Sequence, residues 1–156
     1  SPRAVFLLVL PGKTLWLDGA SQPIFQANAL LGLQLTVDTA LDYLRFFCFF
    51  VRSQGAPFYV VEDPGDPNLA ELRRTRPELV ESIARPASLE TGVDGIFRAR
   101  AAILFDNHCF RAAFDISPAG LVTMTDDDRL RPGWCVSSCR SAREEPDPDR
   151  AGPSDL

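Results

Sequence analysis

Runs of apolar residues predict a hairpin near the beginning of the chain. Residues 4–18 hold two such runs on either side of Pro11–Gly12, a pair that suits the centre of a type II turn. The first run also has the composition of a short signal peptide, but no small-residue cleavage site follows it, which favours a buried strand. Residues 20–35 show no regular period and are expected to wrap irregularly over the sheet.

An aromatic-rich helix is predicted over residues 37–52, with Thr36 as its N-cap. Its apolar positions recur at helical spacing and define a stripe for the core: Val37, Leu41, Leu44, Cys48 and Val51. Phe46 and Phe49 fall on the opposite, charged side and are neighbours because they are three residues apart. We expect these two rings to be covered by the segment at 67–85 or by the wrap at 20–35, to form a subunit interface, or to line a ligand pocket.

The middle of the chain is predicted to hold one strand and one interrupted helix. The strand is expected at 56–62, and the helix at 67–85 with a break at Pro77. Asp66 precedes a proline and is therefore placed to cap this helix. Residues 86–95 are expected to form a loop.

The pattern from Ala99 onward predicts a three-stranded meander. A tight turn at Asn107–His108 would place Arg100 opposite Asp115, and a second turn at "SPAG" would place Arg111 opposite Asp126. The same register gathers the apolar residues on one face: Ala99, Ala101, Ile103, Phe105, Phe110, Ala112, Phe114 and Ile116. The alanines of this face leave room for the bulky side chains of the aromatic helix.

The element order β-β-α-β-α-β-β-β predicts an α+β fold, with a mainly antiparallel, curved sheet packed against a long aromatic-rich helix. This layout resembles the cone-shaped NTF2-like and cystatin-like domains, although the strands come first here and a helix comes first in the usual NTF2-like order. Residues 1–128 are expected to form a single domain. Residues 129–156 are rich in proline and charge and are expected to be a disordered tail.

Composition narrows the class of partner. The net charge of −5 argues against a nucleic-acid partner, which requires a clustered positive surface. No apolar run approaches the ~20 residues that span a bilayer, so no membrane partner is expected. Lys13 is the single lysine among 16 basic residues, a bias typical of a GC-rich, bacterial-like genome. Cys48 and Cys109 fall in predicted core elements, which favours reduced thiols and a cytoplasmic location.

Candidate chemistry is sparse. The stretch "PGKT" lacks the first glycine and the following helix of a phosphate-binding loop, so it is interpreted as a turn. Cys135 and Cys139 have no second ligand pair nearby in sequence, and neither a metal nor a cofactor is predicted. Asp106 and His108 are the candidates for acid–base catalysis, since an imidazole near a carboxylate is a usable general base.

The charged face of the meander supplies candidate ligand-binding residues: Arg100, Arg111 and Asp115. The leading hypothesis is a non-catalytic binding module that self-associates through Phe46 and Phe49, or that binds an unidentified protein or small molecule. The alternative is a small pocket enzyme of hydrolase or isomerase type. It would use Asp106 or His108, with Arg100 or Arg111 holding an anionic substrate.

Overall fold

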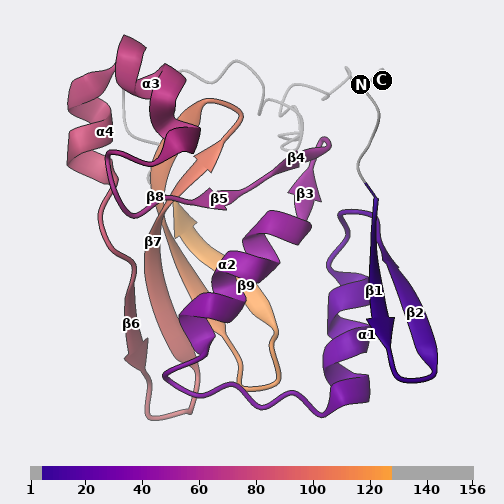
Figure 1. The fold of residues 1–156 in the computed structure, drawn as a ribbon. Helices are drawn as coiled ribbons and strands as arrows, with labels where there is room; N and C mark the ends of the chain where they lie inside the picture. Colours follow the sequence, from indigo (N-terminus) through magenta and orange to yellow (C-terminus); the bar gives the residue numbers. More distant parts are fainter. Residues whose placement is uncertain (1–4, 128–156) are drawn as a thin grey trace, which may run out of the picture.

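The computed structural model describes residues 5–127 and shows the predicted α+β fold, with an open, curved antiparallel sheet (Figure 1). Strands β5, β7, β8 and β9 lie side by side in that order, and β6 pairs with the other half of the same edge of β7. Their bounds are Tyr59–Val60 (β5), Ser88–Thr91 (β6), Phe97–Phe105 (β7), His108–Ile116 (β8) and Val122–Asp127 (β9). Strand β6 corrects the prediction of a loop at 86–95.

Strands β7 and β8 form the predicted hairpin, but its turn lies one residue earlier than expected. Asp106 and Asn107 occupy the two central positions with φ of 44° and 63°, so Phe105 pairs with His108. A short polar side chain tolerates the left-handed conformation better than the imidazole of His108 does. Asp115 consequently lies opposite Arg98, and the predicted pairing of Arg100 with Asp115 is wrong.

The second hairpin of the meander also departs from the prediction. Ile116 pairs with Val122, so the connection is longer than a four-residue turn. The register then shifts between Ala113 and Phe114, which is the signature of a β-bulge in β9. Asp126 pairs with Ala113, so the predicted pairing of Arg111 with Asp126 is wrong.

The inner face of the sheet packs against helix α2 (Ala40–Phe50), as the hydrophobic pattern predicts (Figure 1). Leu44 and Cys48 are buried from the helix side, among the alanines and phenylalanines of the sheet. The helix begins later than predicted because residues 36–39 form a turn in which Thr39, rather than Thr36, is the N-cap. Val37 therefore precedes the helix and is exposed, contrary to its predicted place in the core stripe.

Part of the outer face of the sheet is covered by three short helical segments. These are a 3-10 turn (Pro67–Leu69) with α3 (Ala70–Thr75) and α4 (Pro77–Ile83), and they break at Pro77 as predicted. The Asp66 carboxylate accepts a hydrogen bond from Asn68 N, which confirms the predicted cap. Ala102 and Leu104 are buried beneath these helices, so this half of the outer face belongs to a second core.

The N-terminal hairpin is formed as predicted, with β1 (Phe6–Leu10) pairing with β2 (Lys13–Leu17). The next segment is not an irregular wrap but helix α1 (Gln22–Leu31). A proline in the first turn and left-handed Gly32 after the last turn delimit this helix, a combination that favours helix starts and stops. Its weak apolar periodicity hid the helix from the sequence pattern.

A third apolar cluster joins the hairpin, α1 and α2. Leu17, Ile24 and Phe47 are its buried members, one from each element. The chain leaves α2 through two very short strands, β3 (Arg52–Ser53) and β4 (Ala56–Pro57). Two separate short strands, β4 and β5, therefore replace the continuous strand predicted at 56–62. None of the helices within residues 5–127 has the length and apolar composition needed to cross a bilayer.

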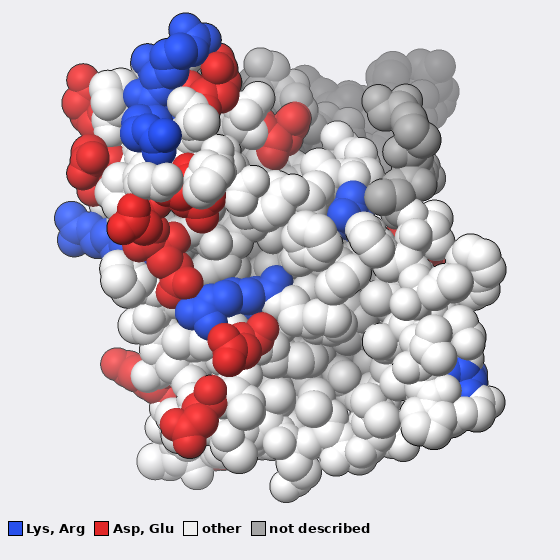
Figure 2. All heavy atoms as spheres, viewed as in Figure 1, with Lys and Arg blue, Asp and Glu red and all other residues white. Residues whose placement is uncertain are grey.

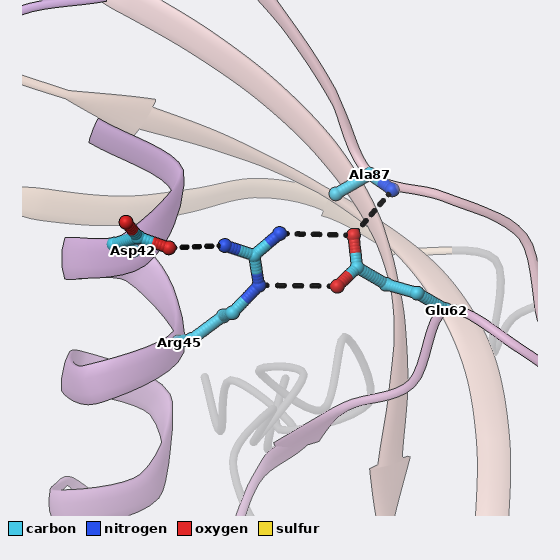
Figure 3. Close-up of polar contacts among 4 residues, drawn as sticks. All are labelled: Asp42, Arg45, Glu62 and Ala87. Atoms are coloured by element: carbon cyan, nitrogen blue, oxygen red, sulfur yellow. Dashed lines mark hydrogen bonds and ion pairs between the residues drawn. The ribbon is translucent and has the colours of Figure 1, made fainter. Parts of the chain in front are cut away.

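A polar network ties α2 to the segments on either side of α3 and α4 (Figure 3). Arg45 donates two hydrogen bonds to the Glu62 carboxylate, at 3.1 and 3.0 Å, and one to Asp42 at 2.6 Å. Ala87 N donates to the same Glu62 carboxylate at 3.0 Å, just before β6 begins. The hydrogen bonds from Arg45 are the main cause that lowers the pKa of Glu62, and partial burial opposes them.

Acid is expected to remove the contribution of this network to stability. Because the pKa of Glu62 is lower in the folded state than in the unfolded state, its contribution is complete above the unfolded value and disappears as pH falls through the folded one. We expect Glu62→Gln to lower the free energy of unfolding by about 1 kcal/mol near neutral pH. In urea titrations this difference should shrink as pH falls below the ordinary pKa of a glutamate and vanish once the pH is below the lowered pKa of Glu62 in the folded state.

The matched control is Glu71→Gln, which breaks the more exposed ion pair with Arg74. Its effect on the free energy of unfolding should be smaller, because solvent screens exposed pairs. If Glu62→Gln lowers the free energy of unfolding by the same amount at neutral and acid pH, the role assigned to the Glu62 carboxylate is contradicted.

Candidate functional site

Two surfaces of the described chain are candidates for function, and the first is a polar groove on the outer face of the sheet. It has a volume of about 370 Å³ and lies where α3 and α4 leave the sheet uncovered. Strands β6 to β9 all contribute to its lining: Ser88, Glu90, Arg98, Ala99, Arg100, Ala113, Phe114, Asp115 and Thr125. The bulge in β9 lies beside Ala113 and adds Thr125 to the wall of the groove.

A smaller hollow shares Arg100 and Ala113 with this groove and adds Arg111 and Asp126. Arg100 lies opposite Ala113, and Arg111 lies opposite Ala102, so the two arginines are diagonal neighbours on one face. Such neighbours are about 7–8 Å apart at the backbone, within reach of long side chains. The structure therefore brings Arg100 and Arg111 together in the hollow, and Asp115 lines the adjoining groove together with Arg100.

The arginines of this face differ in how they are paired. Arg98 forms ion pairs with Asp94 at 2.8 Å and with Asp115 at 3.8 Å. Within residues 5–127, the guanidinium groups of Arg100 and Arg111 have neither a hydrogen bond nor an ion pair. The outer face thus holds one arginine in ion pairs and two that form no ion pair with a described residue.

The predicted catalytic candidates lie elsewhere, at the tip of the β7–β8 hairpin. His108 Nδ1 is 2.8 Å from the backbone carbonyl oxygen of Asp106, not from its carboxylate. His108 is three residues from Arg111, which corresponds to about 10 Å along the strand and to opposite faces of the sheet. The structure does not bring Asp106 and His108 together with the two arginines.

The second candidate surface is the outward side of the N-terminal hairpin, which we call the hairpin face. It comprises Val5, Leu7, Val9, Thr14 and Trp16. Leu7 pairs with Trp16 across the strands, and both side chains are more than half exposed, at 55% and 65%. The inward side is covered, since Leu15 and Leu17 are buried.

The surroundings of the hairpin face are almost without charge. Between residues 4 and 37 only Lys13 and Asp18 are charged. Figure 2 shows charged side chains concentrated over α3, α4 and the start of α2, and a broad uncharged area over the hairpin and α1. Of the large apolar side chains that the described part of the chain leaves exposed, all but Val93 and Leu121 belong to residues 5–37.

Phe46 and Phe49, the predicted interface residues, are half-buried in an aromatic cluster. Phe49 contacts Phe6 of the hairpin, with ring centroids 6.2 Å apart, and Phe46 contacts Phe50 at 4.8 Å. The Arg52 guanidinium lies 5.5 Å from the centroid of the Phe49 ring, a cation–π arrangement. Part of the cover of Phe49 therefore comes from the hairpin, which is neither of the two segments expected to cover these rings.

The described cysteines are structural. Burial raises the pKa of Cys48 to about 12 and that of Cys109 to about 11, so both thiols stay protonated near neutral pH. Cys135 and Cys139 lie outside the described residues. In residues 5–127 no group of three or more His, Cys, Asp or Glu side chains is arranged to hold a metal ion.

Sequence reasoning missed the hairpin face because an uninterrupted apolar run is typical of a strand buried on both sides. The available signal was the scarcity of charge over residues 4–37, which no other stretch of that length in the chain matches. Comparison with known protein families, curated proteins and solved structures gives no match to this chain.

Proposed function

We propose that this protein is a non-catalytic binding module that self-associates, and that the hairpin face is the contact between two copies. The observation that carries the proposal is the exposure of Leu7, Val9 and Trp16 on one side of a two-stranded sheet. An apolar side of this kind on a soluble domain marks an interaction site.

Charge supports a second copy as the partner. Two chains of net charge −5 repel each other, so their contact must avoid the acidic parts of the surface. Residues 4–37, which include the hairpin face, carry one positive and one negative residue, Lys13 and Asp18, and are therefore neutral. Contact through this area leaves the charged side chains over α3 and α4 exposed to solvent.

Sheet geometry supports the same partner. A two-stranded hairpin is marginally stable alone and gains stability when both of its apolar sides are packed. Two hairpin faces related by a two-fold axis present the same alternating Leu, Val and Trp side chains to each other, as an isologous contact requires. Face-to-face packing of two sheets buries such side chains in a layer about 10 Å thick.

The test is the oligomeric state of the full chain. Analytical ultracentrifugation at micromolar concentration is expected to show a dimer, and the double variant Leu7→Ser/Trp16→Ser is expected to be a monomer. Because both side chains are exposed in the single chain, the variant should keep its cooperative unfolding transition.

The matched control is Val93→Ser, which removes an exposed apolar side chain far from the hairpin in sequence. It is expected to leave the dimer intact. A monomeric wild-type chain, or a dimer that persists in the double variant, would overturn the proposal. Dissociation by Phe46→Ser/Phe49→Ser alone, in a folded variant, would move the contact to the aromatic cluster.

A further inference from the structure

We propose that Arg100 and Arg111 form a binding site for the oxyanion group of a small molecule, a phosphate or a carboxylate. The site lies on the outer face of the sheet, on the opposite side from α2, and does not depend on the hairpin face. It comprises the small hollow around the two arginines and the polar groove that opens beside it.

The first argument is the uncompensated charge. Arg100 and Arg111 are diagonal neighbours on adjacent strands, and in residues 5–127 their guanidinium groups have no acceptor. Two neighbouring positive charges repel each other, and an anion between them relieves this repulsion. Arg98, on the same strand as Arg100, does form ion pairs with carboxylates. The lack of ion pairs is therefore specific to Arg100 and Arg111 among the three arginines.

The second argument is the space between the side chains. The cross-strand partners of the two arginines are Ala113 and Ala102. Because these side chains are only methyl groups, they leave space beside the two long arginine side chains. Arg111 is half-buried at the edge of the region that α3 and α4 cover, while Arg100 is exposed. The guanidinium fork suits a planar or tetrahedral oxyanion because it donates two parallel hydrogen bonds.

The third argument is the composition of the adjoining groove. Glu90, Asp115 and Thr125 supply acceptors and a hydroxyl beside the arginines. Asp126 lines the hollow itself, so a second anionic group there would be repelled. The site therefore fits a small molecule with one oxyanion group and with hydroxyl or amino groups on its remaining part, better than it fits a polyanion.

The test is titration of the full chain with inorganic phosphate and, separately, with acetate, while the Nε–H signals of the arginines are followed by NMR. Both signals of the proposed pair are expected to shift together. Arg100→Gln and Arg111→Gln are each expected to weaken binding about tenfold or more, the loss of a charge-assisted hydrogen bond. Arg100→Lys, which keeps the charge but loses the fork, should fall between the wild type and Arg100→Gln.

The matched control is Arg85→Gln, because Arg85 is exposed and likewise has no partner among the described residues. This variant should bind as the wild type does. Tighter binding of phosphate identifies a phosphorylated ligand, and tighter binding of acetate identifies a carboxylate. If neither probe shifts the arginine signals, or if Arg85→Gln weakens binding as much as Arg100→Gln does, the proposed site is overturned. This conclusion does not depend on the oligomeric state of the chain.

Discussion

Phe110→Ala is expected to lower the free energy of unfolding by about 3–5 kcal/mol, measured by urea denaturation. Phe110 is 1% exposed and is the largest fully buried side chain in the described part of the chain. It lies in the cluster that also contains Leu44 and Cys48, between the inner face of the sheet and α2. Its removal leaves a cavity that neighbouring β-sheet residues cannot close, because strand spacing is fixed by hydrogen bonds.

Two variants calibrate this result. Phe110→Leu fills most of the space and should cost clearly less than Phe110→Ala. Val93→Ala removes an exposed side chain outside the hairpin face and should change the free energy of unfolding by about 0.5 kcal/mol or less. Equal effects of Phe110→Ala and Val93→Ala would mean that the sheet and α2 do not enclose a packed core.

The inner face was predictable from the sequence although the turn was placed wrongly. The error at the turn moved the pairing between β7 and β8 by two residues, and a shift of two keeps every side chain on its own face. Phe110 and Ala112 therefore face the core in both registers, whereas the predicted partner of Asp115 changed from Arg100 to Arg98. Which face of the sheet a side chain occupies depends on the alternation of residues along the strand. Which residue lies opposite it depends on the conformation of the turn.

The candidate sites were only partly predictable because they depend on packing between distant segments. Arg100 and Arg111 were recognised as candidates on one charged face, but the hollow between them depends on which half of the face α3 and α4 cover. The hairpin face depends on α1, which covers one side of the hairpin and leaves Trp16 on the other. The local sequence pattern shows that a strand is apolar on both sides. It does not show which side packs against another element.

The connection between β8 and β9 shows how one residue joins three segments. Gly120 has a φ of +90°, and its carbonyl oxygen accepts a hydrogen bond from the Tyr43 hydroxyl at 2.6 Å. Asn28 of α1 donates to the same hydroxyl oxygen at 2.8 Å. The position is crowded: a Cβ atom on residue 120 would lie 2.6 Å from Asn28 Nδ2 and 2.9 Å from both Leu33 Cδ2 and the Tyr43 hydroxyl oxygen.

Gly120→Ala is therefore expected to lower the free energy of unfolding by about 2–4 kcal/mol, the sum of backbone strain and steric overlap. Gly12→Ala separates the two causes, since Gly12 also has a positive φ, +74°, but no atom lies within 4 Å of its added Cβ. That control should cost about 1–2 kcal/mol. Equal losses at both positions would show that the contacts around Gly120 contribute nothing.

A double-mutant cycle with Tyr43→Phe gives the decisive measurement. In the wild-type background this change removes the hydroxyl that bridges Asn28 and Gly120, and it should cost about 1 kcal/mol. In the Gly120→Ala background the same change should cost almost nothing, because the added methyl group has already displaced the hydroxyl. If the effects of the two substitutions on the free energy of unfolding are strictly additive, the added methyl group does not displace the Tyr43 hydroxyl. In that case α1, α2 and the β8–β9 connection move together as one body.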